Sequence, residues 1–119
     1  QLRGFYAMDK VSWDHFKKVK IAVGTILNVE DFREAIKPAF KITIDLGTNI
    51  GIKASSAQIT GLYSKAKLIG KQVLVVINLP TKKIGPFNSE CLVTGFYNSD
   101  GDVVLASPDE RIPNGTILE

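Results

Sequence analysis

Hydrophobic and polar residues alternate along several short segments of this 119-residue chain, a pattern typical of half-buried β-strands. The clearest alternation covers residues 40–46, which read Phe-Lys-Ile-Thr-Ile-Asp-Leu. A second alternation, at residues 19–23, predicts that a strand occupies residues 19–29. Gly24 interrupts it, as a β-bulge or a barrel corner would.

Further strands are predicted downstream. Residues 50–53 form a short apolar segment, and residues 72–78 are an almost continuous apolar run, which indicates a strand covered on both faces. Strands are also expected at 91–97 and 103–106, joined by a hairpin turn at 98–101.

Helix is expected only in short pieces. Ser12 can cap a helical turn over residues 12–16, and Ser64 can cap another within the mixed segment 55–67, before Gly70. Five or six short strands without β-α-β alternation predict an all-β fold, and a small closed Greek-key barrel avoids exposed strand edges.

The composition fits one domain, with 45% hydrophobic and 23% charged residues. Residues 1–7 precede the only methionine, Met8, so we interpret them as a vector remnant or a flexible N-terminus and assign residues 8–119 to the domain. No signal peptide follows Met8, and no apolar run is long enough for membrane insertion. We therefore expect a cytoplasmic protein.

Charge is segregated along the chain. Residues 46–89 contain six lysines and no acidic residue, whereas residues 90–119 contain six acidic residues and one arginine. This segregation predicts a basic face that binds anions, although strands that place lysines in solvent would give the same pattern.

The residues offer little for catalysis. His15 is the only histidine and Cys91 the only cysteine, so neither an ordinary zinc site nor an intramolecular disulfide is expected. Cys91 begins an apolar strand, which favours a buried, unreactive thiol. We find no carboxylate pair and no glycine-rich phosphate loop, and we expect a binding protein with no metal and no cofactor rather than an enzyme.

Three segments, residues 16–26, 38–60 and 72–90, together resemble the tRNA-binding domain family. They are most similar to its stand-alone, dimeric branch, the CsaA-like secretion chaperones. The resemblance implies a five-stranded OB-type barrel whose short terminal helical elements build a homodimer. It also implies tRNA binding without strong sequence preference and, for this branch, a chaperone role toward unfolded preproteins bound for export, with the secretion machinery as a further partner.

The resemblance places tRNA-binding residues in two loops. The loop after the third strand supplies Lys53, Ser55, Ser56 and Gln58, and the loop entering the fifth strand supplies Lys82, Lys83 and Ser89. Lysines can neutralise phosphates, and hydroxyl and amide groups can hydrogen-bond phosphate or ribose. Capping and turn formation are the alternative roles for the serines and the glutamine.

The second loop departs from the family pattern. Gly85 and Pro86 stand where stronger tRNA binders carry Arg-Gly, and Glu90 follows the serine. The loss of an arginine and the gain of an acid favour protein clients over tRNA. A CsaA-like chaperone is therefore the predicted function, and a structure-selective, salt-sensitive tRNA-binding accessory protein is the alternative.

Client binding is assigned to residues that could border a peptide groove. Phe87 can stack on a base, seal the barrel end or enter an apolar groove. Arg33, Lys37 and Glu90 can form the rim, and a solvated connection is the alternative for residues 33–37. The apolar residues near the N-terminus are expected to pack against the barrel or against a second subunit: Trp13, Phe16 and Val19.

Overall fold

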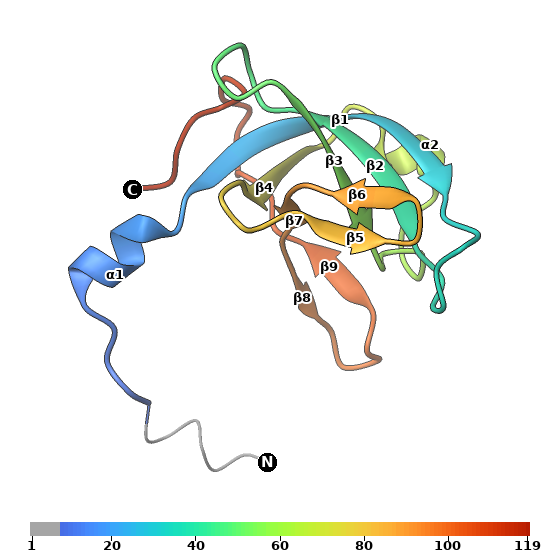
Figure 1. Ribbon diagram of the computed structural model, residues 1–119, viewed down its shortest axis with the longest axis horizontal. Helices are drawn as coiled ribbons and strands as arrows, with labels where there is room; N and C mark the ends of the chain where they lie inside the picture. The colour runs from blue at the N-terminus through green and yellow to red at the C-terminus, as the bar shows by residue number, and fades with distance from the viewer. Residues whose placement is uncertain (1–7) are drawn as a thin grey trace.

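A computed structural model describes residues 8–119 of the chain, so the prediction for residues 1–7 lies outside the described part. The elements of Figure 1 are, in order, α1 (Trp13–Lys18), β1 (Ile21–Asp31), β2 (Phe40–Asp45), β3 (Ile52–Ala57), α2 (Lys65–Leu68), β4 (Gln72–Val76), β5 (Lys82–Ile84), β6 (Phe87–Ser89), β7 (Leu92–Val93), β8 (Gly95–Tyr97) and β9 (Val103–Leu105). None of the helices in this part of the chain is long and apolar enough to cross a membrane.

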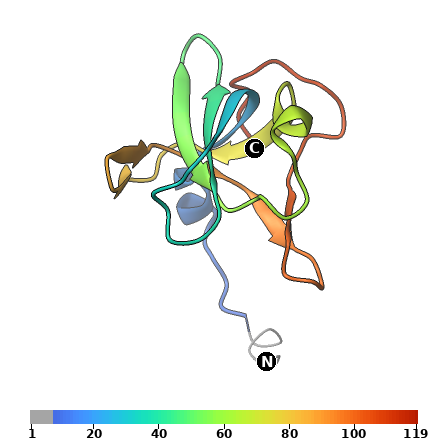
Figure 2. The same cartoon turned by 90° about the vertical axis from the view of Figure 1, so that its right-hand side faces the viewer.

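Five antiparallel strands form the main sheet in the order β3-β2-β1-β4-β7. β1 pairs with both β2 and β4, so the chain returns to β1 after completing β3. The sheet curls into a nearly closed barrel. This confirms the predicted all-β, OB-type barrel. Two hairpins, β5–β6 and β8–β9, project from different sides of the barrel (Figure 2).

Hydrophobic residues at alternate positions of the strands fill the barrel. Ile42 and Ile44 of β2 point inward and are fully buried, as the alternation predicted. Leu68 of α2 is also fully buried and covers the core from one end. The Ser64 hydroxyl accepts the Lys67 amide at 3.2 Å, which confirms the predicted cap.

β1 pairs with β4 through residues 21–25 and with β2 through residues 25–31, so it changes partner at Thr25. A Cβ atom at Gly24 would lie 2.5 Å from Cγ2 of Ile44 and 2.7 Å from Cδ2 of Leu46, so only glycine fits at this close approach. Gly24 is therefore a site of close approach between β1 and the end of β2, and of its two predicted roles the bulge does not fall on it. The bulge lies nearby, between Ile26 and Asn28, where the register against β2 shifts.

Two predicted loops are strands instead. The third strand begins and ends later than its expected range of 50–53, and it includes Lys53, Ser55 and Ser56. The prediction failed because Ala-Ser-Ser has little intrinsic strand propensity, and pairing with β2 decides its conformation. The expected loop at 80–86 contains most of hairpin β5–β6, which turns at Gly85 (φ 58°) and Pro86.

The predicted strand 91–97 is also divided. Residues 92–93 pair with β4 as β7, whereas residues 95–97 leave the main sheet as β8 and pair with β9. The hairpin turn at 98–101 is confirmed, because the Asn98 carboxamide oxygen accepts the amides of Asp100 and Asp102 at 3.0 and 2.9 Å.

Helix α1 stands away from the barrel and buries none of its residues (Figure 1). Its predicted cap is confirmed, since the Ser12 hydroxyl accepts the His15 amide at 3.1 Å. Asn78 fixes the chain where it leaves the helix, accepting the Lys20 amide at 2.9 Å and donating to the Lys18 carbonyl at 2.6 Å. Packing of α1 against its own barrel, one of the two predicted options, is therefore wrong.

Candidate functional site

A groove runs along hairpin β5–β6. It consists of two adjoining hollows of about 390 and 530 Å³. Both hollows are lined by the end of β3 and by one face of β5, through Ser56, Gln58, Lys82 and Ile84. We call the combined depression the hairpin groove.

The hairpin groove brings together residues from two separate predictions. Of the residues assigned to tRNA, it contains Ser56, Gln58, Lys82, Lys83 and Ser89. Of those assigned to clients, Lys37 lines the second hollow, in the loop between β1 and β2. Neither Lys53 nor Arg33 lines either hollow.

Ser55 is fully buried, so the structure does not support its predicted contact with tRNA. Its hydroxyl donates to the Cys91 carbonyl at 3.0 Å. The alternation along β3 explains this, because Ser55 and Ala57 face the core while Ser56 faces the groove side.

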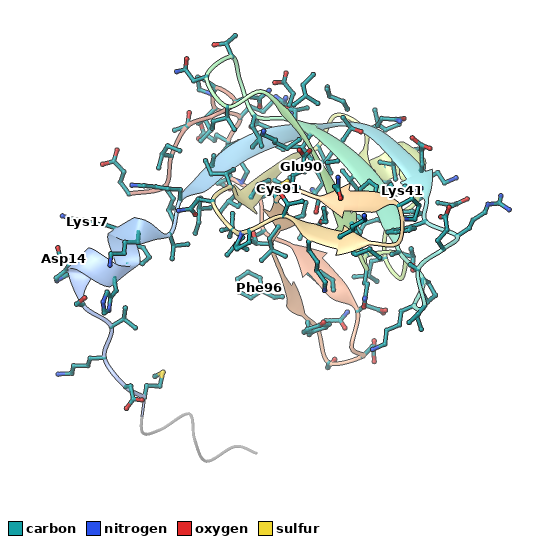
Figure 3. The ribbon with its side chains drawn as sticks, in the orientation of Figure 1. Asp14, Lys17, Lys41, Glu90, Cys91 and Phe96 are labelled. Carbon is teal, nitrogen blue, oxygen red and sulfur yellow. The ribbon has the colours of Figure 1, made fainter. Side chains whose placement is uncertain are left out.

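Side chains close the barrel where strand pairing ends. β3 is an edge strand of the main sheet. Its Ala54 amide donates to the Glu90 carboxylate at 3.0 Å, and the Glu90 amide donates to the Ala54 carbonyl at 2.8 Å. The Ser56 amide donates to the Ser89 hydroxyl at 3.1 Å. We call this set of contacts the barrel seam, and Figure 3 labels Glu90 beside Cys91 within it. Ser89 and Glu90, predicted as ligand contacts, therefore have structural partners.

Phe87 packs at one end of the hairpin. Its ring meets the Phe32 ring edge-on, with centroids 5.2 Å apart. The Lys41 ammonium lies 4.9 Å from the centroid of Phe32 and 5.6 Å from that of Phe87, and 3.6 Å from the Glu34 carboxylate. Phe87 lines neither hollow, and its ring links the hairpin to the loop after β1. The three roles considered for Phe87 stay predictions.

The groove is basic. Lys37, Lys82 and Lys83 border it with exposed side chains, and the acid on the rim, Glu34, is paired with Lys41. The neighbouring segment 46–89 contributes no acid, as its sequence already showed. The arrangement can therefore attract a negatively charged ligand.

Cys91 lies beside the first hollow but is almost completely buried. Burial raises the pKa of its thiol to about 11, the Glu90 carboxylate adds to that rise, and Lys53 opposes it. At neutral pH the thiol is protonated and a poor nucleophile, as the sequence predicted.

Sequence reasoning missed the apolar part of the groove. Leu79, Pro80 and Ile84 line it on the hairpin side, and Ile36 lines it from the opposite loop with its side chain fully exposed. An isoleucine within a charged loop, Arg-Glu-Ala-Ile-Lys, was the available signal. Within residues 8–119 no group of three or more His, Cys, Asp or Glu side chains could hold a metal ion.

Residues 21–117 match the family described as "Putative tRNA binding domain". The chain belongs to this family. Curated relatives include methionine–tRNA ligase 1 of Bacillus anthracis, 38% identical over 112 residues, and methionine–tRNA ligase of Methanothrix thermoacetophila, 34% identical over 106 residues. These matches cover 93% and 88% of this chain but only 16% and 15% of the ligases, so the chain spans about a sixth of their length.

Three similar solved structures are covered over their whole length. The chaperone CsaA of Bacillus anthracis has a TM-score of 0.87 at 40% identity, and CsaA of Picrophilus torridus has 0.87 at 45% identity. The matches cover 93% and 92% of this chain and 100% of each of those chains. A methionyl-tRNA-synthetase-related protein of Pyrococcus horikoshii follows at 0.82 and 26% identity. The predicted resemblance to the CsaA-like branch is confirmed.

Proposed function

We propose that this chain is a cytoplasmic, CsaA-like chaperone that holds non-native polypeptides, including preproteins bound for export, in the hairpin groove. The similarity to two CsaA chaperones at 40% and 45% identity, with each of them covered completely, is the observation that carries the proposal. The methionine–tRNA ligases, in contrast, share only a small part of their length with this chain.

The lining of the groove supports a polypeptide ligand. Ile36, Ile84 and Leu79 offer apolar surface to a chain that has not yet buried its own hydrophobic residues. The lysines at the rim add charge that selects among such segments. Because the groove is open at the surface, a polypeptide segment can enter it without being folded.

The proposal includes a homodimer. Trp13 of α1 exposes 77% of its surface, and Phe16 and Val19 on the same side of the chain are also exposed. A hollow of about 430 Å³ lies between these residues and the C-terminal residues 117–119. A second copy of the chain that covers this surface would bury aromatic rings that water otherwise contacts.

The chaperone proposal is tested by the aggregation of a chemically denatured client after dilution. The wild-type protein, in stoichiometric amount, is expected to suppress light scattering, and an Ile36→Asp/Ile84→Asp variant is expected to lose most of that effect. Leu62→Asp is the matched control, because Leu62 is exposed and apolar but lies outside the groove. Scattering unchanged by the wild-type protein would contradict the proposal.

Binding of tRNA is the second candidate function, and Lys82 and Lys83 at the rim of the groove favour it. Each phosphate neutralised by a lysine makes the affinity more sensitive to salt. We expect Lys82→Ala/Lys83→Ala to weaken tRNA binding and to reduce the salt dependence by about one to two released ions. Lys67→Ala/Lys71→Ala, from the same acid-free segment but away from the groove, serves as the control.

A tRNA affinity that does not respond to salt would contradict the second candidate. So would equal losses in the two double variants, because the effect would then come from total charge and not from the groove.

A further inference from the structure

Strand β5 has one edge that no other strand covers. In the described part of the chain it pairs only with β6, in the register Lys82↔Ser89, Lys83↔Asn88 and Ile84↔Phe87. The hairpin turns through two residues, Gly85 and Pro86, so the pair next to the turn, Ile84 and Phe87, is the hydrogen-bonded one. β5 is therefore the outer strand of a two-stranded sheet.

The register fixes where the backbone groups of Lys83 point. In antiparallel sheets, hydrogen-bonded and non-hydrogen-bonded pairs alternate. Since Ile84 and Phe87 form a hydrogen-bonded pair, Lys83 and Asn88 form a non-hydrogen-bonded pair, and the N–H and C=O of Lys83 point away from β6. An outward donor and an outward acceptor thus lie side by side on the free edge.

This free edge opens onto the hairpin groove. The larger hollow is lined by the consecutive residues 82–85, whose side chains point alternately to the two faces of the hairpin. A hollow lined by residues of both faces extends around the strand edge that separates them, and the other edge of β5 is occupied by β6. Across the hollow lie Ala35, Ile36 and Lys37 of the loop between β1 and β2. The hollow, at about 530 Å³, has room for several residues of an extended chain.

We propose that β5 is a docking edge for an extended polypeptide segment that carries acidic side chains, which adds to hairpin β5–β6 as a third strand. This inference rests on the proposed chaperone function and specifies how a client is held. A folded protein has already paired its strand edges, so backbone pairing of this kind selects non-native segments. The lysines beside β5 add a preference for segments with acidic side chains.

The backbone groups of Lys83 favour a polypeptide over RNA. A peptide strand offers both an N–H and a C=O, and so it can satisfy the donor and the acceptor of Lys83 together. A phosphate group only accepts hydrogen bonds, so RNA would have to supply the donor for the carbonyl from a separate ribose or base group. Acidic side chains on the client complement Lys37, Lys82 and Lys83, whereas the rim acid, Glu34, is already paired with Lys41.

The proposal is tested with Lys83→Pro and Lys83→Ala in the otherwise complete chain. Proline removes the outward N–H, at an edge position where the hairpin does not use it, while alanine removes only the charge. The probe is a short fluorescein-labelled peptide in which valine and glutamate alternate, titrated by anisotropy. We expect Lys83→Pro to bind about fivefold more weakly than Lys83→Ala, the effect of one hydrogen bond. Equal affinities of the two variants would overturn the proposal.

A second measurement does not depend on a substitution. Saturation of the wild-type protein with the same peptide is expected to slow hydrogen exchange at the Lys83 amide. The same peptide N-methylated at every amide, so that neither of its edges can pair, is expected to give no such protection. Binding that leaves this amide unprotected would overturn the docking edge while the proposed chaperone function stands. No binding of the peptide and no suppression of aggregation would overturn both.

Discussion

Glu90 shows how a single side chain can replace strand pairing. β3 and the segment after β6 are not joined by a regular ladder, and the Glu90 carboxylate instead accepts the Ala54 amide at 3.0 Å. An amide left without an acceptor in this half-buried place costs free energy. The acid that distinguishes this chain from the family pattern therefore has a structural reason to be present.

We expect Glu90→Ala to lower the free energy of unfolding by about 1–3 kcal/mol, because the Ala54 amide loses its acceptor. Glu90→Gln is the matched control, since its side-chain oxygen can accept the same hydrogen bond. Urea denaturation measures both variants. If the glutamine variant were as unstable as the alanine variant, the charge of Glu90 rather than its acceptor would be responsible.

Cys91 gives the protein a specific response to alkaline pH. Burial raises the pKa of its thiol to about 11 in the folded state, against about 8.5 in an unfolded chain. A group whose folded pKa is raised stabilises the fold fully below its unfolded pKa, and this contribution declines as pH rises toward the folded pKa. The stability of the wild-type protein should therefore fall between about pH 8.5 and pH 11.

The difference in unfolding free energy between the wild type and Cys91→Ala isolates this response from other titrating groups. We expect the difference to shift by about 2–3 kcal/mol against the wild type over that range. A difference that stays constant with pH would contradict the burial of the thiol.

Strand β1 requires a small residue at position 24. Gly24 lies so close to Ile44 and Leu46 that a Cβ atom would collide with both side chains. Gly24→Ala is expected to destabilise the protein by about 1–3 kcal/mol, the usual cost of overpacking a core. Thermal unfolding followed by circular dichroism measures the loss, and an unchanged midpoint would show that the corner has room to relax.

An element could be predicted from sequence when its own residue pattern, rather than its pairing with a neighbouring strand, determines its conformation. β2 was predicted with nearly its observed bounds because its own residues alternate between core and surface. β3 was placed too early, because Ala-Ser-Ser follows the pairing imposed by β2. Hairpin β5–β6 was taken for a loop, since two exposed lysines and a proline give no alternation to detect.

The same distinction applies to the candidate site. The lysines at 82 and 83 and the hydroxyl and amide groups at 56 and 58 could be selected because they match positions that the family resemblance implies. Ser55 could not be separated from Ser56, because only the inward or outward direction along β3 distinguishes them. Phe32, the partner of Phe87, lies far away in sequence and gave no signal.

At the scale of the molecule, helix α1 does not pack against the barrel. Figure 3 shows Asp14 and Lys17 on α1, away from the strands, and Phe96 exposed on β8. Aromatic surface left on two separate projections is costly for a monomer in water. The proposed homodimer removes this cost for α1.

We expect the wild-type protein to elute as a dimer and Trp13→Ala/Phe16→Ala to shift it toward the monomer, because these rings form the exposed face of α1. Size-exclusion chromatography with light scattering gives the mass of each. Leu27→Ala, at an exposed apolar position on β1, is the control and should stay dimeric. A monomeric wild-type protein would contradict the proposed assembly.

By itself, the sequence determined that this chain forms an all-β barrel of the tRNA-binding domain family, because periodicity and family motifs are local properties of the chain. It also determined that the segment 46–89 is basic. Only the tertiary structure decided which of those residues meet. Ser55 of β3 points into the core, and Ser89 and Glu90 form the hydrogen bonds of the barrel seam. The loop after β1 lies across the groove from β5. These contacts join residues more than thirty positions apart, and no local pattern specifies them.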